Sequence, residues 1–373
     1  MRSPTLAELP SPPPGRSGWP WTEQSPEPAG LMPDGAAWPR VCIVTPSYNQ
    51  AEFIEETIRS VLLQRYPALE YIVIDGGSND GSVEIIKKYE RWLHYWASEP
   101  DGGQAHAIDK GWSRGSGQIL AYLNSDDTYL VGSVAAAVQA LASSPLAPAV
   151  CGSELLIDRE GIVIAERPVK SAGLKELRRL GYISQPTVFL RRSCLEHVGG
   201  LDLTYHMVFD YELWTRLAQC GDFCCVPQVL ATTRWHPHTK TQSQRPLIAR
   251  ELERTINGIL SSTDGPAIGR IERRVIRARL DYELLSIYLD DPTHNGGLVV
   301  RHALHAAIAW PPMILWVVRL LASGLTAGRI GPAGASARHR PKGPQAAGQD
   351  KSKVLWSEWR PQQAAPSAAT RRQ

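Results

Sequence analysis

Two adjacent carboxylates, Asp126 and Asp127, follow a short apolar run in the string LNSDD at residues 123–127. Neighbouring negative charges repel one another unless a cation or a ligand compensates them. Hard divalent cations such as Mg²⁺ take oxygen ligands and bridge diphosphates. The pattern therefore indicates a divalent-metal site, although an acidic loop with no such task would also have this appearance.

Hydroxyl and amide side chains gather in TPSYNQ at residues 45–50, directly after a predicted strand. At the start of a helix such groups can hydrogen-bond a nucleotide, or Ser47 or Asn49 can simply cap the helix. A second polar turn begins at Asp75, which could accept a hydrogen bond from a base or a ribose. The glycine fingerprint GxGxxG is missing from the first turn, which argues against a nicotinamide or flavin enzyme.

A third acidic position, Asp210, begins a predicted helix over residues 209–216. A carboxylate at a helix start is stabilised by the backbone dipole, so capping alone could explain it. Helical spacing places Leu213 and Trp214 on the turn that follows Asp210.

These side chains must be positioned by an α/β framework. Short apolar runs at residues 41–44, 71–74 and 119–123 predict buried strands, and residues 51–63 and 82–89 have helical periodicity. Alternation of strands and helices predicts a mostly parallel sheet flanked by helices. In such sheets ligands bind at the carboxyl ends of the strands, which is where the polar strings fall.

Five strings occur in order over about residues 40–244, and together they resemble a family 2 glycosyltransferase with the Rossmann-like GT-A fold. The strings are TPSYNQ, IDGGSNDGS, SEPDGGQ, LNSDD and DYELW. The sequence is most similar to the bacterial branch that makes polysaccharides, glycolipids or cell-surface glycans.

The resemblance implies a pocket for a nucleotide-sugar donor, with a UDP-sugar as the expected donor. Asp75 would contact the base, although Gly76 stands where many relatives have a second acid. The remaining donor-binding positions implied by the resemblance are Pro46, Ser47, Tyr48, Asn49, Asp101, Gln104, Asn124, Ser125 and Lys240.

The resemblance also implies an inverting, metal-assisted transfer that uses Mn²⁺ or Mg²⁺. Asp126 aligns with the chief metal ligand, Asp127 is the fallback and His236 is a further candidate. Asp210 aligns with the general base, which would take the proton of an acceptor hydroxyl. Glu212 and Trp214 would lie on the acceptor side.

Composition limits the alternatives. With 43% hydrophobic and 21% charged residues, the chain can bury a core. Residues 331–373 carry eight Lys or Arg and two Asp or Glu; removing this +6 from a total of +3 leaves −3 elsewhere. The body is therefore not basic, and no nucleic-acid partner is predicted.

The predicted organisation has four parts. Residues 1–39 hold ten prolines and are predicted to be a disordered leader, residues 40–244 form the catalytic domain, and residues 331–373 form a disordered basic tail. Residues 245–330 are predicted to be a helical extension. Its apolar stretch at residues 303–318, interrupted by Pro311 and Pro312, suits peripheral membrane contact, or else a core helix that covers the catalytic domain.

The sequence therefore predicts a cytoplasmic protein, and the resemblance implies an enzyme that transfers a sugar to a glycan or a lipid-linked acceptor. Contact with the inner face of the plasma membrane is one of the two alternatives for residues 303–318. The first twenty residues lack the apolar run of a secretory signal. A glycoside hydrolase would also need carboxylates, but not a nucleotide pocket. The main rival is a catalytically inactive scaffold of the same fold that binds nucleotide-sugars or carbohydrates.

Overall fold

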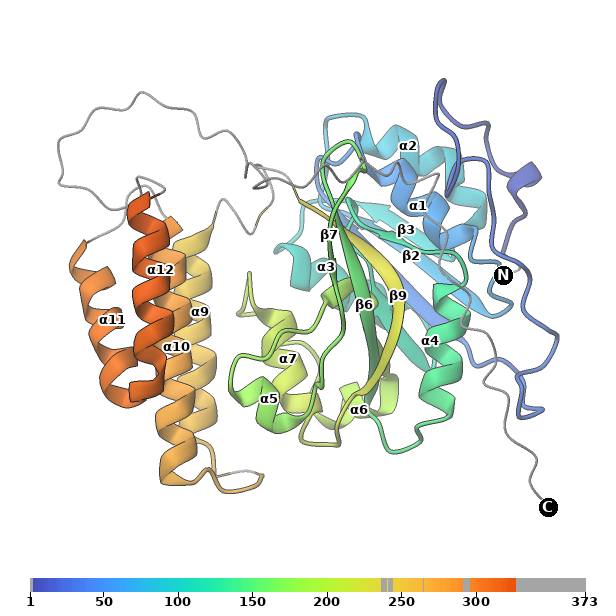
Figure 1. The fold of residues 1–373 in the computed structure, drawn as a ribbon. Helices are drawn as coiled ribbons and strands as arrows, with labels where there is room; N and C mark the ends of the chain where they lie inside the picture. The colour runs from blue at the N-terminus through green and yellow to red at the C-terminus, as the bar shows by residue number, and fades with distance from the viewer. Residues whose placement is uncertain (1–2, 236–239, 241–243, 264, 291–295, 327–373) are drawn as a thin grey trace, which may run out of the picture.

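The computed structural model describes residues 3–235, 240, 244–263, 265–290 and 296–326. A twisted sheet with helices on both faces forms the larger part of the chain, and a bundle of long helices stands beside it (Figure 1). The expected basic tail, residues 331–373, lies outside the described residues.

One half of the sheet is parallel, with strand order β3-β2-β1-β4. Every residue of β1 and β2 is buried, as continuous apolar runs require when helices cover both faces. The register pairs Ser47 with Asp75, so the two polar strings that follow these strands are neighbours. The strands are β1 (Val41–Ser47), β2 (Leu69–Asp75), β3 (Tyr95–Ser98) and β4 (Ile119–Tyr122).

The other half is mixed. Strand β8 is antiparallel to both β4 and β6, and β6 is parallel to β9. The carboxyl ends of β1, β4, β6 and β9 consequently share one edge of the sheet. The strands are β5 (Thr128–Tyr129), β6 (Ala149–Ile157), β7 (Val163–Arg167), β8 (Phe189–Arg191) and β9 (Cys224–Arg234).

Helices form two layers over the sheet. One apolar core lies beneath α1 (Ile54–Leu62), α2 (Ser82–Tyr89) and α4 (Ser133–Ala142). The opposite core lies beneath α3 (Gln104–Arg114), α5 (Leu174–Arg178), α6 (Arg192–His197) and α7 (Phe209–Leu217). Single 3₁₀ turns occur at Leu6–Glu8, Glu90–Trp92, Gln185–Thr187 and Pro311–Met313.

The prediction of a disordered leader is wrong for residues 3–39. This segment packs along α1 and the start of α4, where Trp19 and Trp21 are buried and the Trp19 indole donates to the Tyr129 carbonyl. The proline content of residues 1–39 suggested disorder because the residue that binds this segment, Arg59, lies in α1, outside the segment itself. Its guanidinium donates to the carbonyls of Pro10, Pro20 and Trp21.

The helical extension consists of α9 (Arg245–Ser261), α10 (Arg270–Asp290), α11 (Gly296–Ala309) and α12 (Ile314–Thr326). Two of these helices, α9 and α10, precede residue 291. Pro311 and Pro312 divide the apolar stretch into α11 and α12, which pack on α10 rather than on the sheet. No helix among the described residues is both long enough and apolar enough to cross a membrane.

Candidate active site

Asp75 organises the turn that follows β2. Its carboxylate accepts hydrogen bonds from the amides of Gly77 (3.1 Å) and Ser78 (2.8 Å) and from the hydroxyls of Ser78 (2.5 Å) and Ser98 (2.7 Å). A carboxylate offers about four acceptor sites, so these donors occupy it. In this structure Asp75 therefore holds the turn after β2 together, and its contact with a base stays a prediction.

The Tyr48 and Asp101 side chains lie over Gly76. A Cβ atom at this position would lie 3.3 Å from the Tyr48 ring and 3.4 Å from the Asp101 carboxylate, so the two side chains converge there. The Tyr48 side chain is 63% exposed, whereas the Asp101 carboxylate is held by the amide of Gly103 at 2.7 Å. An exposed ring beside a fixed carboxylate can stack on a base and bind sugar or base N–H and O–H groups.

The loop after β1 is locked to the turn after β2. Asn49 has a positive φ of 51°, and its side-chain oxygen accepts from the amide of Asn79 at 3.1 Å. Pro46 is a buried residue of β1, and Ser47 follows it at the strand end. The Ser47 hydroxyl is buried and has no hydrogen-bond partner among the described residues, which makes it an available donor at the strand end.

Asn124 joins the loop after β4 to two neighbouring elements, α3 and the turn that begins at Gln185. Its oxygen accepts from Gln104 at 2.6 Å, and its amide group donates to Asp127 and Gln185 at 3.2 Å each. Gln185 in turn donates to the Tyr122 carbonyl at 2.9 Å. Gln185 was not a predicted site residue, because nothing in its local sequence shows that its partner is more than sixty residues away.

Asp127 is a buried structural group rather than a metal ligand facing the site. Its two oxygens accept from the Arg234 amide at 2.9 Å and from Asn124 at 3.2 Å. Burial, together with the neighbouring Asp126 charge, raises the pKa of Asp127 well above its usual value. This corrects its assignment as a fallback ligand and leaves Asp126, which is partly exposed, as the acidic candidate in this loop.

Arg234 fixes this acidic loop in place. It is almost fully buried, its Nε donates to the Asp126 carbonyl at 3.1 Å, and it forms an ion pair with Glu56 at 3.0 Å. Arg234 was not a predicted site residue, because its partners Asp126 and Glu56 lie more than one hundred residues earlier in the chain. Of the other predicted positions here, Ser125 is buried, and His236 lies outside the described residues.

Asp210 lies in the first turn of α7, on the face of the sheet where β4 ends. The preceding residue, Phe209, packs its ring 5.9 Å from that of Tyr122, two residues before Asn124. Desolvation raises the pKa of the Asp210 carboxyl to about 6, opposed by hydrogen bonds from backbone amides and by the Lys240 charge. A carboxyl with this pKa is a stronger base than an exposed one and is ionised at neutral pH.

Lys240 connects the acidic groups of the site. Its ammonium group donates to the His206 carbonyl at 2.6 Å and to the Gln104 side chain at 3.3 Å. Burial lowers its pKa, while Glu251, Asp210 and Asp101 raise it. The cation therefore lies within electrostatic reach of both Asp101 and Asp210, which the sequence places more than one hundred residues apart.

Two predicted acceptor-side residues face away from the site. Glu212 forms a two-point ion pair with Arg216, at 2.7 and 2.6 Å, one turn further along α7. Trp214 is buried in the core and packs edge-on against Phe223. Helical periodicity identified α7, but it could not show which side of the helix meets the ligand.

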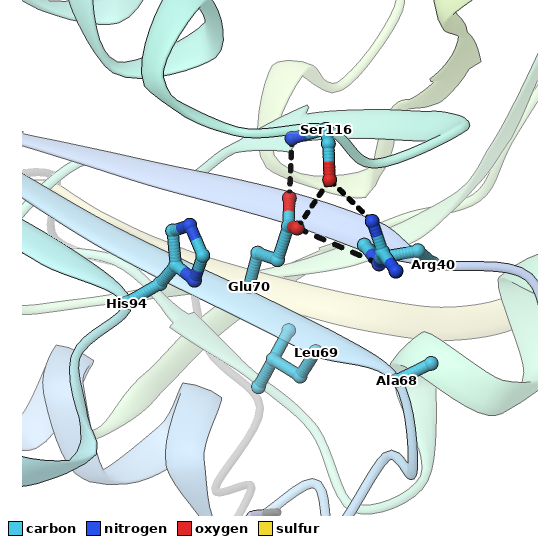
Figure 2. Close-up of a pocket in the computed structure, with 6 residues that line it drawn as sticks. All are labelled: Arg40, Ala68, Leu69, Glu70, His94 and Ser116. Atoms are coloured by element: carbon cyan, nitrogen blue, oxygen red, sulfur yellow. Dashed lines mark hydrogen bonds and ion pairs between the residues drawn. The ribbon is translucent and has the colours of Figure 1, made fainter. Parts of the chain in front are cut away.

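Two cavities lie outside the candidate active site. One of about 300 Å³ occupies the amino-terminal edge of the sheet, where Glu70 accepts two hydrogen bonds from Ser116 and pairs with Arg40 (Figure 2). These contacts satisfy the Glu70 carboxylate and tie β2 to the turn after α3. A second cavity of about 290 Å³ lies beside β6 and β7. Neither cavity is lined by Tyr48, Asp101, Asp126 or Asp210.

Comparison with known proteins gives a consistent result. Residues 42–191 match the model of glycosyl transferase family 2. A glycosyltransferase of Mycobacterium tuberculosis is 33% identical over 183 residues, which cover 48% of this chain and 69% of the relative. The teichuronic acid biosynthesis glycosyltransferase TuaG of Bacillus subtilis is 39% identical over 94 residues, covering 24% of this chain and 37% of TuaG.

Solved structures share the fold. The S. aureus protein TarS in complex with UDP-GlcNAc superposes with a TM-score of 0.52 at 16% identity, covering 78% of this chain and 85% of the TarS chain. A mannosyltransferase from Pyrobaculum calidifontis in complex with GDP-Man and Mn²⁺ gives a TM-score of 0.52 at 22% identity, covering 82% and 85%.

The sheet, its loops and the relatives define a glycosyltransferase of the GT-A fold, as the resemblance predicted. The chain belongs to glycosyl transferase family 2.

Proposed function

We propose that this protein is an inverting glycosyltransferase that moves a sugar from a nucleotide donor to a hydroxyl acceptor, with Asp210 as general base. The observation that carries this proposal is the position of Asp210: a desolvated carboxyl of raised pKa, linked through Phe209 and Tyr122 to the loop that bears Asp126. A scaffold without catalytic activity has no need of such a group.

The donor would lie across the carboxyl ends of β1, β2 and β4. Tyr48 and Asp101 over Gly76 offer a stacking surface and an acceptor for the nucleoside, and the unpaired Ser47 hydroxyl offers a donor at the strand end. Lys240 supplies a positive charge where the diphosphate would need one. The nucleotide-sugars in the TarS and mannosyltransferase structures, UDP-GlcNAc and GDP-Man, support this class of donor.

A divalent cation fits this site only together with a nucleotide. Among the described residues, no three His, Cys, Asp or Glu side chains come together as a metal cluster. Mg²⁺ is often held by one or two carboxylates with substrate phosphates as the other ligands. Asp126 would supply that carboxylate, and the cation would stabilise the negative charge of the departing diphosphate.

The reaction then requires one proton transfer within the protein. Asp210 removes the proton of the acceptor hydroxyl while that oxygen forms a bond to the anomeric carbon. The bond from that carbon to the diphosphate oxygen breaks, and the electron pair leaves with the nucleoside diphosphate. A single displacement from the opposite side inverts the anomeric configuration.

Calorimetric titration with UDP, GDP and dTDP, with and without Mn²⁺, tests the donor site. We expect one nucleotide to bind in a metal-dependent manner. Asp126→Asn should weaken that binding by about 10- to 100-fold, because the residue that holds the metal loses its charge. Asp127→Asn is the matched control and should stay within about threefold of the wild type, because Asp127 faces Arg234 and Asn124.

The two alternatives predict different titrations. If the folded protein binds none of the three nucleotides, the donor site is wrong. If it binds one but transfers no sugar, the inactive scaffold becomes the better description. Equal losses in the Asp126 and Asp127 variants would contradict the assignment of Asp126 as the metal residue.

We further propose that α11 and α12 contact the membrane that carries a lipid-linked acceptor. Val300, Leu304 and Ile308 recur at four-residue spacing on α11 and are more than half exposed. Leu315, Trp316 and Val318 are similarly exposed on α12, and Arg301 and Arg319 flank the patch. An exposed apolar face bordered by arginine is typical of helices that lie in a bilayer interface.

Sedimentation with anionic vesicles tests this contact. Replacing both Leu304 and Ile308 by glutamate should reduce vesicle binding at least about tenfold, because two apolar side chains that would be buried in the bilayer, and their transfer free energy, are lost. Leu146→Glu is the control, since Leu146 is 89% exposed on the catalytic domain. Equal vesicle binding by the double variant and the wild type would contradict the proposed membrane contact.

A further inference from the structure

The carboxylate of Glu251, in the first half of α9, holds the segment that leads into α7. It accepts hydrogen bonds from three consecutive backbone amides, those of His206 (2.8 Å), Met207 (2.8 Å) and Val208 (3.0 Å). The side chain is only 5% exposed. Hydrogen bonds to an ionised carboxylate are roughly twice as strong as neutral ones, so this is a firm attachment.

We propose that Glu251 is a positioning residue for Asp210, an assignment that rests on the proposed function. Asp210 follows the last of the three amides by two residues, so the direction in which α7 starts decides where its carboxylate points. The Val208 side chain does not cap the helix, so the attachment at this end comes from α9.

The same segment is held from its other side by Lys240, whose ammonium group donates to the His206 carbonyl. The peptide groups around His206 are thus bound on the amide side by Glu251 and on the carbonyl side by Lys240. Because Lys240 also contacts Gln104, the attachment links α9 and α7 to the loops around the donor site.

Neighbouring residues on the same face of α9 also bind the segment that leads into α7. Arg254 donates to the Thr204 hydroxyl at 2.8 Å, and Thr255 to the Tyr205 hydroxyl at 3.3 Å, three and four residues after Glu251. The opposite face packs on α10 through Ile256, which is fully buried. The extension is therefore part of the catalytic apparatus, although it lies beyond residues 42–191 that match the family model.

The test compares Glu251→Ala with Ile256→Ala in the full chain. Loss of Glu251 should lower kcat by about 10- to 100-fold, because small displacements of a catalytic group have effects of this size, while the Kd for nucleotide stays within about threefold. Glu251→Gln keeps one acceptor oxygen and should lie between the wild type and the alanine variant. Ile256→Ala removes packing on the far face of α9 and should lower thermal stability without this loss of kcat.

Amide hydrogen exchange provides a readout that does not depend on activity. The amides of His206, Met207 and Val208 should exchange faster in Glu251→Ala and remain protected in Ile256→Ala. Unchanged protection of these amides, an unchanged kcat, or an equal loss of kcat in Ile256→Ala would overturn the proposal.

Failure of the base assignment would appear differently. If Asp210→Asn keeps full activity, the proposed function loses its base, whatever the exchange of the three amides shows. Faster exchange in Glu251→Ala with an unchanged kcat would show that Glu251 holds the segment but that the segment does not position a catalytic group, and the inference would fail alone.

Discussion

Replacement of Asp210 by asparagine is expected to lower kcat by about 1000-fold, within the range that general base catalysis contributes. Asparagine has nearly the same shape, and its side-chain oxygen can still accept from the Tyr211 amide, which donates to Asp210 at 2.7 Å. It cannot take up a proton. Nucleotide affinity should stay within about twofold, because no donor-binding group is removed.

The pH dependence of the wild-type kcat provides a second check on the same group. A base acts only when deprotonated, and the pKa of Asp210 is raised to about 6. Activity should therefore be low below that pH, rise through it and reach a plateau above it. In Asp210→Asn the residual kcat should no longer increase with pH around 6.

Glu212→Gln is the matched control for Asp210→Asn. Glu212 lies two residues further along the same helix, and its carboxylate is bound to Arg216 rather than directed at the site. We expect kcat to stay within about threefold of the wild type, with a small loss of stability from the broken ion pair. Near-normal activity in Asp210→Asn, or a large loss in Glu212→Gln, would show that α7 presents a different acid.

The parts of the structure that the sequence predicted are those determined by local pattern. Continuous apolar runs identified β1, β2 and β4, and helical spacing gave α2 its observed limits, Ser82–Tyr89. Because polar strings follow buried strands at one edge of the sheet, the region of the site was also predictable. The resemblance to the family, rather than the local pattern, assigned Asp126 and Asp210, and they remain the proposed metal and base residues.

The remaining features depend on partners far apart in the chain. Asp127 has the residue type and the location of a ligand group, but the amide of Arg234, more than one hundred residues further along the chain, donates to it. The resemblance implied an acceptor-side place for Trp214, and helical period could not correct this because it does not distinguish a core face from a binding face. The sequence does not distinguish Glu251 from the other charged residues of α9, because the three amides that bind it lie more than forty residues earlier in the chain.

Removal of residues 1–39 is expected to prevent stable folding of the catalytic domain. The leader buries Leu9, Trp19 and Trp38 in the core beneath α1, so its loss would expose that core to water. Full burial of a single large apolar side chain contributes about 1.5–3 kcal/mol, and stabilities of whole domains are only about 5–15 kcal/mol. The truncated chain should therefore aggregate or unfold at room temperature, as circular dichroism and size-exclusion chromatography would show.

Arg59→Ala tests the same attachment without shortening the chain. Arg59 is fully buried in α1, and its guanidinium donates to the carbonyls of Pro10, Pro20 and Trp21 and to the Tyr89 hydroxyl. Its removal leaves buried acceptors without donors, at a cost of about 1–3 kcal/mol for each group that water cannot reach. We expect Tm to fall by roughly 10 °C, since each kcal/mol lowers Tm by about 2–4 °C in domains of 150–250 residues.

Glu27→Gln is the control for Arg59→Ala. Glu27 also attaches the leader to the catalytic domain, through an ion pair with Arg65 just after α1, but its side chain is exposed. Exposed pairs contribute about 0–1 kcal/mol, so Tm should change by no more than a few degrees. If the truncated chain keeps the Tm and the nucleotide affinity of the full chain, the leader is dispensable. If instead the truncated chain unfolds, and Arg59→Ala lowers Tm by roughly 10 °C while Glu27→Gln changes it by no more than a few degrees, the first 39 residues are part of the catalytic domain and the buried Arg59 guanidinium holds them there.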